Sequence, residues 1–213
     1  MVIFIVFSIF FYFLGSFPTS YLLGKSLYKI DILNKGSKHS GLSNIYKYSS
    51  RKIIFLILFI DIFLKGFIPS CIISNYFSEY IFSCIFLIIG HNWPFFLRLN
   101  GGKGLSVSIG ILAGINIYVF FLLIIFFFVF WMIEQFKDSS MPWVLSFFST
   151  ILVLIIDIFY FNALFESISK ISLFSIIIVF LLLLFRRSLG NREYNSYNPK
   201  ILFIRLIFDR DVK

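Results

Sequence analysis

The residues with the clearest chemical potential form the run Gly101-Gly102-Lys103-Gly104. Three glycines leave backbone N–H groups uncovered, and the lysine among them supplies one movable cation. This combination suits a phosphate or acyl-phosphate group. It does not match a nucleotide P-loop, which would need glycine where Leu97 stands and serine or threonine directly after the lysine. Taken alone, the run is equally consistent with a flexible turn between two helices.

A second polar loop, residues 36–44, also has a composition that suits an anion. It carries hydroxyl groups, an amide, an imidazole and two glycines within nine positions. Such a segment can direct N–H and O–H donors at one bound anion. The alternative is an ordinary connection between membrane helices, rich in residues that form turns. The function of both loops therefore depends on whether the fold brings them together.

The composition indicates a membrane protein. The chain of 213 residues is 60% hydrophobic and only 14% charged, whereas a soluble domain is nearer half apolar. Apolar runs recur along the whole length, which predicts an all-α polytopic membrane protein. The first run starts at Met1 with no basic segment or cleavage site, so we expect it to be retained as a span. The formal charge of +9 is then attributed to orientation in the membrane rather than to nucleic-acid binding.

The distribution of basic loops predicts seven membrane helices, with the N-terminus outside and the C-terminus in the cytoplasm. The uncharged run 104–133 is long for one span and short for two. If it turns near Asn116, the basic loop 24–52, Lys103 and the basic tail all fall on the cytoplasmic side, which basic segments prefer. The expected spans, within a single membrane domain followed by a basic cytoplasmic tail at 186–213, are 2–23, 53–73, 80–97, 104–116, 118–133, 141–161 and 171–185. This arrangement places both glycine-containing loops on one face of the membrane.

Several other polar residues bear on such a site. His91 could transfer a proton or serve as a hydrogen-bonded structural residue, and the structural role is favoured. Asp61 and Lys65 are four residues apart and share a helix face, so we expect a buried ion pair, with support of a site as the second interpretation. Ser139 and Ser140 lie on the same side as both loops, where helix capping is favoured over ligand binding.

Metal and nucleotide chemistry are not indicated. Two separated histidines and scattered acids form no ligand cluster, so no metal site is expected. Neither a nucleotide-binding fingerprint nor a nucleophile elbow is present.

The ordered set of motifs resembles the acyl-phosphate:glycerol-3-phosphate acyltransferases of bacterial membranes, the PlsY family. The matching pieces, in order through most of the chain, are Gly15-Ser16-Phe17-Pro18, Gly24-Lys25, Asp31-Ile32, Gly36-Ser37, Gly41-Leu42-Ser43-Asn44, Lys65-Gly66, Gly90-His91 and Gly101-Gly102-Lys103-Gly104. Each piece is common by itself, but their order and spacing together are specific. The family has seven membrane helices and a site that faces the cytoplasm, which agrees with the loop charges.

The resemblance implies transfer of an acyl group from acyl phosphate to the 1-hydroxyl of sn-glycerol 3-phosphate. The products are lysophosphatidic acid and phosphate, in the first acylation step of phospholipid synthesis. Acyl phosphate is a mixed anhydride, so the protein must mainly hold two phosphates close together and stabilise developing charge. No metal or organic cofactor is implied. The implied partners are both substrates, membrane lipids and the enzyme that supplies acyl phosphate, with no nucleic acid; the implied location is the bacterial inner (cytoplasmic) membrane.

The matched positions define a candidate site. The resemblance implies catalytic roles for Lys103 and Ser37. Substrate binding is expected at Gly41, Ser43, Asn44, Lys47, His91, Gly101, Gly102, Gly104, Ser140 and Arg186. In this family the leaving phosphate is thought to accept the proton of the attacking hydroxyl, which would remove the need for a protein base.

The chain also departs from the family pattern. In the first loop Lys38 and His39 replace a glycine and an asparagine, and Lys38 lacks glycine's freedom at positive φ. Leu33 stands where the family has arginine, and Lys47 keeps the charge of an arginine without its bidentate geometry. The run 185–189 lacks the histidine and asparagine that are expected to help hold glycerol 3-phosphate. The alternative is therefore a catalytically weakened or inactive homologue, or an anion-binding membrane transporter, although no clear internal repeat is present.

Overall fold

A computed structural model describes residues 1–137, 139–161, 168–189 and 198–209. Within these residues all regular secondary structure is helical. By length and composition, five described segments could cross a membrane: Val2–Tyr28, Arg51–Tyr76, Ser78–Leu97, Ser140–Phe161 and Lys170–Ser188. The described residues are thus helical wherever they are regular, with several segments suited to crossing a membrane, as the composition predicts. The chain divides into two compact units, Met1–Gly114 and Ile115–Lys213.

The uncharged run 104–133 forms two helices, α7 (Leu105–Ile115) and α8 (Ile117–Ile133). They separate at Asn116, whose side-chain oxygen accepts hydrogen bonds from two N–H groups in the first turn of α8, at 2.9 and 3.1 Å. Such a cap fixes where a helix begins. The division falls at the position where a turn was predicted. The seven-span topology and the orientation in the membrane stay predictions.

The first apolar run is broken in its second half. Helix α1 (Val2–Ser16) ends before Phe17, and α2 (Thr19–Tyr28) begins directly after Pro18. Proline has no N–H group and pushes the preceding residue out of the helical region. Phe17 is accordingly extended, with φ −62° and ψ 115°. The break brings polar backbone groups into the middle of a candidate span.

The second span is one helical segment with an unusual centre. It consists of α4 (Arg51–Leu58), the π-helix η1 (Phe59–Phe67) and α5 (Ile68–Tyr76). The π-helical turns carry Asp61 and Lys65, both buried. Wide turns of this kind are rare and are often found at functional sites.

The third span ends in the loop that carries the glycine run. It consists of the 3₁₀-helix η2 (Ser78–Cys84), α6 (Ile85–Asn92) and a short turn, η3 (Phe95–Leu97). The first polar loop, in turn, leads into the one-turn helix α3 (Leu42–Ile45). Both loops belong to the first unit.

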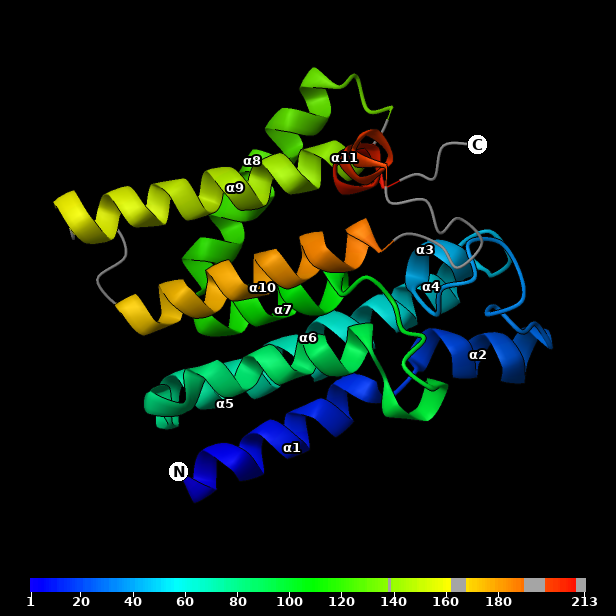
Figure 1. Cartoon of the computed structure of the whole chain (residues 1–213), viewed down its shortest axis with the longest axis horizontal. Helices are drawn as coiled ribbons and strands as arrows, with labels where there is room; N and C mark the ends of the chain where they lie inside the picture. Colours follow the sequence, from blue (N-terminus) through cyan, green and yellow to red (C-terminus); the bar gives the residue numbers. More distant parts are fainter. Residues whose placement is uncertain (138, 162–167, 190–197, 210–213) are drawn as a thin grey trace. The chain divides into compact units, whose positions relative to one another are not determined.

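Glycines permit the closest helix contacts of the first unit. Helices α1 and α6 lie side by side in Figure 1, with Gly15 against the carbonyl of Leu87 and Gly90 against the carbonyl of Tyr12. Gly66 in η1 meets α7 at Gly110, where a β-carbon on residue 66 would lie 2.7 Å from the opposite Cα. Any side chain at these positions would separate the two backbones, so the glycines set how near the helices can come.

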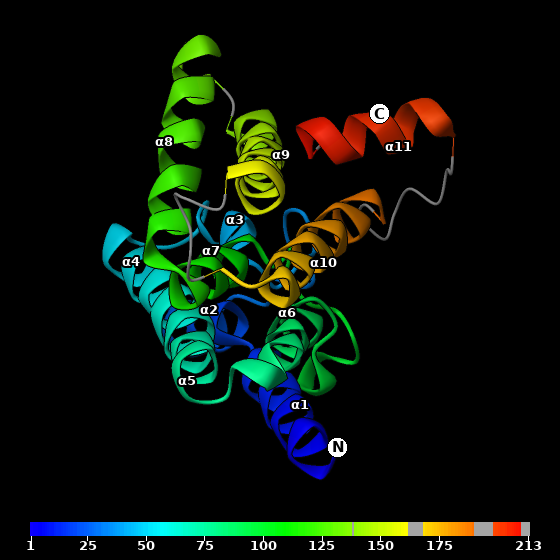
Figure 2. The same ribbon diagram turned by 90° about the vertical axis from the view of Figure 1, so that its left-hand side faces the viewer.

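The second unit is built from α8, α9 (Ser140–Ile156) and α10 (Lys170–Ser188), with the π-helical turn η4 (Asp157–Phe161) continuing α9. Figure 2 shows α8 beside α9, where the rings of Phe127 and Trp143 stack with centroids 4.0 Å apart. Aromatic stacking of this kind adds to the burial of apolar surface.

The basic tail contains a helix, α11 (Pro199–Phe208), packed against α9 and α10. Asn198 caps it by accepting a hydrogen bond from the Lys200 N–H at 3.0 Å, and proline follows at the first helical position. Arg187 donates to the carbonyls of Ser140 at 3.1 Å and Leu206 at 3.4 Å. The tail helix is therefore joined to the end of α10 and the start of α9. Residues 190–197 and 210–213, which include Arg192, lie outside the described residues.

Candidate functional site

The two polar loops meet backbone to backbone at two glycines. A β-carbon on Gly102 would lie 3.3 Å from the Cα of Gly41, and one on Gly41 would lie 3.9 Å from the N atom of Lys103. Both glycines are buried. The convergence of the loops, on which their shared function depends, is therefore present within the first unit.

The glycine run is packed onto the end of α6. The N–H of Gly102 donates to the carbonyl of His91 at 3.1 Å, and a β-carbon on Gly102 would lie 2.5 Å from His91 Nε2. Gly101 lies against the carbonyls of His91 and Asn92. Lys103 is half-buried beside this contact. His91, Gly102 and Lys103 are thus neighbours, as the predicted site requires.

Gly104 ends the run in a conformation that favours glycine. Its φ is +80°, in the left-handed region. A β-carbon there would also lie 2.6 Å from Oδ1 of Asn92. Its carbonyl accepts two hydrogen bonds from Ser108, from N–H at 2.9 Å and from the hydroxyl at 2.8 Å. Gly104 therefore turns the chain from the loop into α7.

A single side chain shapes the first loop. The amide nitrogen of Asn44, which is 1% exposed, donates to the carbonyls of Ile32, Lys35 and His39 at 2.7, 3.0 and 3.0 Å. Its oxygen accepts from the N–H of Ser37 at 3.1 Å. These contacts engage the amide hydrogens of Asn44 within the loop. The structure thus gives Asn44 the role of positioning Ser37, and a direct contact with substrate stays a prediction.

The other predicted residues of this loop differ in exposure. Ser37 is half-buried, while Ser43 and Lys47 are exposed. Lys38 has φ +56°, so it does occupy a left-handed position where the family glycine would be unstrained.

Ser140 and Arg186 belong to the second unit. Ser140 is the first residue of α9, and its carbonyl is the one that Arg187 binds. Arg186, in the last turn of α10, is buried. Ser139 stands at the N-cap of α9, but its side chain makes no capping hydrogen bond with the described residues, so the favoured capping role is not seen there.

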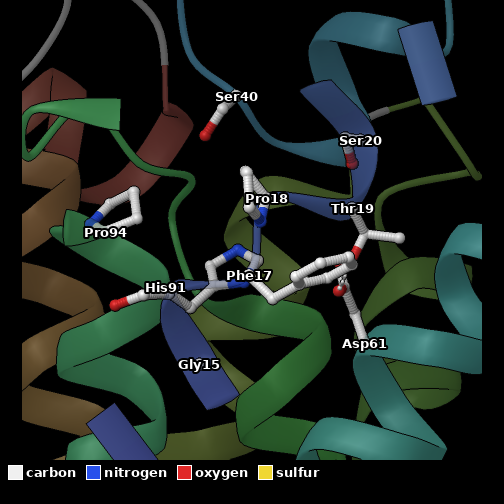
Figure 3. A pocket seen from close by; sticks show the side chains of 10 residues that line it. Gly15, Phe17, Pro18, Thr19, Ser20, Ser40, Asp61, His91 and Pro94 are labelled. Atoms are coloured by element: carbon white, nitrogen blue, oxygen red, sulfur yellow. Dashed lines mark hydrogen bonds between the residues drawn. The ribbon is translucent and has the colours of Figure 1, made fainter. Parts of the chain in front are cut away.

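A polar pocket lies in the first unit beside the two loops. The break in the first span provides one part of it, and Ser40, Asp61, His91 and Pro94 provide the rest. Figure 3 shows these side chains, with the hydroxyl of Thr19 directed at Asp61. That hydroxyl donates to Oδ1 of Asp61 at 3.0 Å. The pocket therefore combines hydroxyl, imidazole and carboxylate groups from three spans and a loop.

The predicted ion pair is confirmed in the wall of this pocket. Lys65 Nζ lies 2.6 Å from Oδ1 of Asp61, and both residues are 2% exposed. The same ammonium group donates to the carbonyl of Phe17 at 2.6 Å. The pair thus reaches across from η1 to the break in the first span.

An open apolar pocket adjoins the polar one. Its volume is about 250 Å³, and it shares Phe17 and Pro18 with the polar pocket. The other lining residues are Tyr21, Leu22, Phe96 and Leu97. A hydrocarbon chain placed there would have its end next to the polar groups.

Sequence reasoning missed three residues of this region. Ser40 lines the pocket, and Thr19 binds Asp61. Asn92 is fully buried beside Gly104, and its side-chain amide has no hydrogen-bond partner among the described residues. Only Thr19 carried a usable signal, because it is a hydroxyl residue directly after a proline that interrupts a span.

Known glycerol-3-phosphate acyltransferases are similar to this chain. The sequence model of the family described as glycerol-3-phosphate acyltransferase matches residues 5–193. A glycerol-3-phosphate acyltransferase of Anaplasma marginale (strain Florida) is 33% identical over 141 residues, which is 65% of this chain and 70% of that protein. The crystal structure of PlsY (YgiH), an integral membrane glycerol 3-phosphate acyltransferase, in its glycerol 3-phosphate form, has a TM-score of 0.71 at 26% identity. That match covers 86% of this chain and 88% of the other.

Proposed function

Because the chain belongs to the glycerol-3-phosphate acyltransferase family, we propose that it transfers an acyl group from acyl phosphate to the 1-hydroxyl of sn-glycerol 3-phosphate. The products are lysophosphatidic acid and inorganic phosphate. The observation that carries this proposal is the contact of Gly41 with Gly102 and Lys103. It brings two donor-rich loops to one place beside His91, where two phosphates have to be held.

The geometry supports a direct displacement. The hydroxyl oxygen forms a bond to the acyl carbonyl carbon, the bond from that carbon to the phosphate oxygen breaks, and the phosphate leaves with the hydroxyl proton. Lys103 stabilises the negative charge on the phosphate and the carbonyl oxygen. Ser37, held by Asn44, orients the second phosphate. The protein then contributes positioning and charge stabilisation.

The apolar pocket between Phe17 and Leu97 suits the acyl chain. A fatty acyl chain in a bilayer would enter such a pocket at little cost, because it leaves one apolar medium for another. Its reactive end would then lie near His91 and Ser40. Acyl phosphate itself must come from an enzyme that makes it.

The test is acyl transfer by the purified protein in detergent or lipid. Release of phosphate from palmitoyl phosphate should require glycerol 3-phosphate, with lysophosphatidic acid identified by mass spectrometry. Lys103→Ala should reduce turnover by about 100-fold, as expected for loss of one preorganised charge contact, and Lys103→Arg should retain more activity. Full turnover in Lys103→Ala would remove that residue from the site.

We propose further that the protein crosses a bacterial inner membrane seven times, with both loops facing the cytoplasm. The separation of α7 and α8 at Asn116 supports this topology. In a cysteine-free background, an impermeant maleimide should label Lys170→Cys in intact cells and Lys137→Cys only after permeabilisation. The opposite labelling pattern would reverse the orientation.

A weakened or inactive homologue, or an anion-binding transporter, is the second candidate. Leu189, at the end of α10, is exposed where the family has an asparagine, and its side chain cannot hydrogen-bond. Complementation of a strain that lacks its own acyltransferase separates the two candidates. Growth supports the enzyme, and absence of growth at normal membrane expression supports the second candidate.

A further inference from the structure

The break in the first span creates a local shortage of hydrogen-bond donors. In a continuous helix each carbonyl accepts the N–H four residues later, but Pro18 has no N–H to offer to Leu14. The Leu14 carbonyl instead accepts a long bond from the Phe17 N–H at 3.4 Å. Non-helical backbone at membrane depth is tolerated only where the protein itself satisfies the polar groups.

From a different span, Lys65 adds a charged donor to the break and Asp61 adds an acceptor. The Phe17 carbonyl also accepts a hydrogen bond from the Thr19 N–H at 3.0 Å. Lys65 Nζ donates to the Phe17 carbonyl at 2.6 Å, on one side of Pro18. Asp61 Oδ1 accepts from the Thr19 hydroxyl at 3.0 Å, on the other side. The pair therefore holds the break at both of its ends. The same two groups neutralise each other at 2.6 Å, which lets them remain buried.

The ion pair lies on a segment that is packed against α7. Asp61 and Lys65 both lie within the nine residues of η1, and Gly66 directly follows the lysine against Gly110 of α7. The glycine contact fixes the backbone of η1 against α7, so the ion pair is held on a packed support. Positions of this kind are more precise than positions on a loop.

We propose that the Asp61–Lys65 pair is a positioning device for the acyl-transfer site. The pair holds residues 16–20 in place. These residues form the part of the polar pocket's wall that faces His91 and Ser40. This inference rests on the proposed function, but the position of the break can also be measured without catalysis. A pair retained only for stability would be replaceable by apolar side chains, because such replacements are often neutral or stabilising.

The test removes the pair without leaving a buried charge. The double variant Asp61→Leu/Lys65→Met keeps apolar bulk in η1, and Thr19→Val is a milder variant that removes only the contact to Asp61. Thr150→Val is the matched control, because Thr150 is also buried and its hydroxyl has no hydrogen-bond partner among the described residues. The melting temperature in detergent, kcat and the KM for glycerol 3-phosphate are measured for each.

Loss of the ion pair should lower kcat. The double variant should keep its melting temperature, because apolar replacement of a buried ion pair is often neutral. It should lose about tenfold or more in kcat, because misplacement of the reacting groups slows the reaction. Thr19→Val should show a smaller loss, and Thr150→Val none. Unchanged kcat in both the double variant and Thr19→Val would overturn the proposal.

The position of the break is followed by thiol labelling. In a background without Cys71 and Cys84, Ser20→Cys lies at the break and is expected to react slowly with a maleimide, because Ser20 is 2% exposed. Removing the pair should raise its rate about tenfold, while Ser8→Cys, buried within α1, should not change. An unchanged rate overturns the positioning role whatever the activity. If the rate rises but the native protein transfers no acyl group, the proposed function fails and the positioning role stands.

Discussion

The two loops of the site reach defined conformations by different means. The loop 36–44 is held by one side chain, because Asn44 binds four backbone groups around it. The run 101–104 is held by close packing of its backbone against His91 and Asn92, with no room for a β-carbon at any of its three glycines. A loop held from inside by one residue tolerates replacements elsewhere along its length. A loop held by its own lack of side chains tolerates almost none.

This difference agrees with where the chain departs from its family pattern. Lys38 and His39 are replacements in the first loop, whereas all three glycines of the second are retained. Three substitutions test the comparison, in order of expected effect.

The largest effect is expected for Asn44→Asp. This change keeps the oxygen that accepts from Ser37 but places a second oxygen against three carbonyls, which removes every donor. The cost should be at least about 3 kcal/mol, the upper range for one buried unsatisfied polar group. Turnover should fall to background with a lowered melting temperature. Asn34→Ala is the control, since that side-chain amide is exposed and, among the residues that the structure describes, binds the side chain of Asp31. A comparable loss in both variants would contradict the special role of Asn44.

Gly102→Ala should have an intermediate effect. The added methyl group would lie 2.5 Å from His91 Nε2, so the imidazole or the loop must move. Overpacking of this kind costs about 1–3 kcal/mol, and turnover should fall by about 10- to 100-fold. Gly24→Ala is the matched control in the same unit, because its β-carbon meets the flexible end of Ile45 at 3.1 Å. Normal kinetics in Gly102→Ala would show that close packing does not hold this loop.

Lys38→Gly should have the smallest effect. It removes a left-handed strain of about 1 kcal/mol, but the greater freedom of glycine in the unfolded chain offsets most of that gain. The melting temperature should change by no more than a few degrees, with turnover equal or slightly raised. Lys35→Gly, at a position without positive φ, should only destabilise. A clear loss of activity in Lys38→Gly would mean that the lysine side chain itself is used.

Features set by charge and local polarity could be predicted from the sequence. The distribution of basic loops predicts the turn at Asn116, and the four-residue spacing of Asp61 and Lys65 predicts their ion pair. The number of membrane crossings between the two loops predicts that they lie on the same side. The π-helical turns of η1 could not be predicted, because nine mostly apolar residues carry no pattern that distinguishes i→i+5 from i→i+4 hydrogen bonding. The role of Asn44 was missed since hydrogen bonds to distant backbone groups leave no pattern in the sequence. Asn92 was missed because nothing in the neighbouring sequence indicates that its side chain is buried beside the glycine run.

The crossing of α1 and α6 has a consequence for how such a sequence can evolve. The chain contains 32 phenylalanines but only 12 glycines, and many of its exposed apolar side chains could be exchanged for others in contact with lipid. At Gly15 and Gly90 no exchange is possible without moving a helix. Ser16 and His91 stand directly beside these two positions. Extensive drift in composition can therefore leave the polar geometry intact, provided that a few residues without side chains are retained.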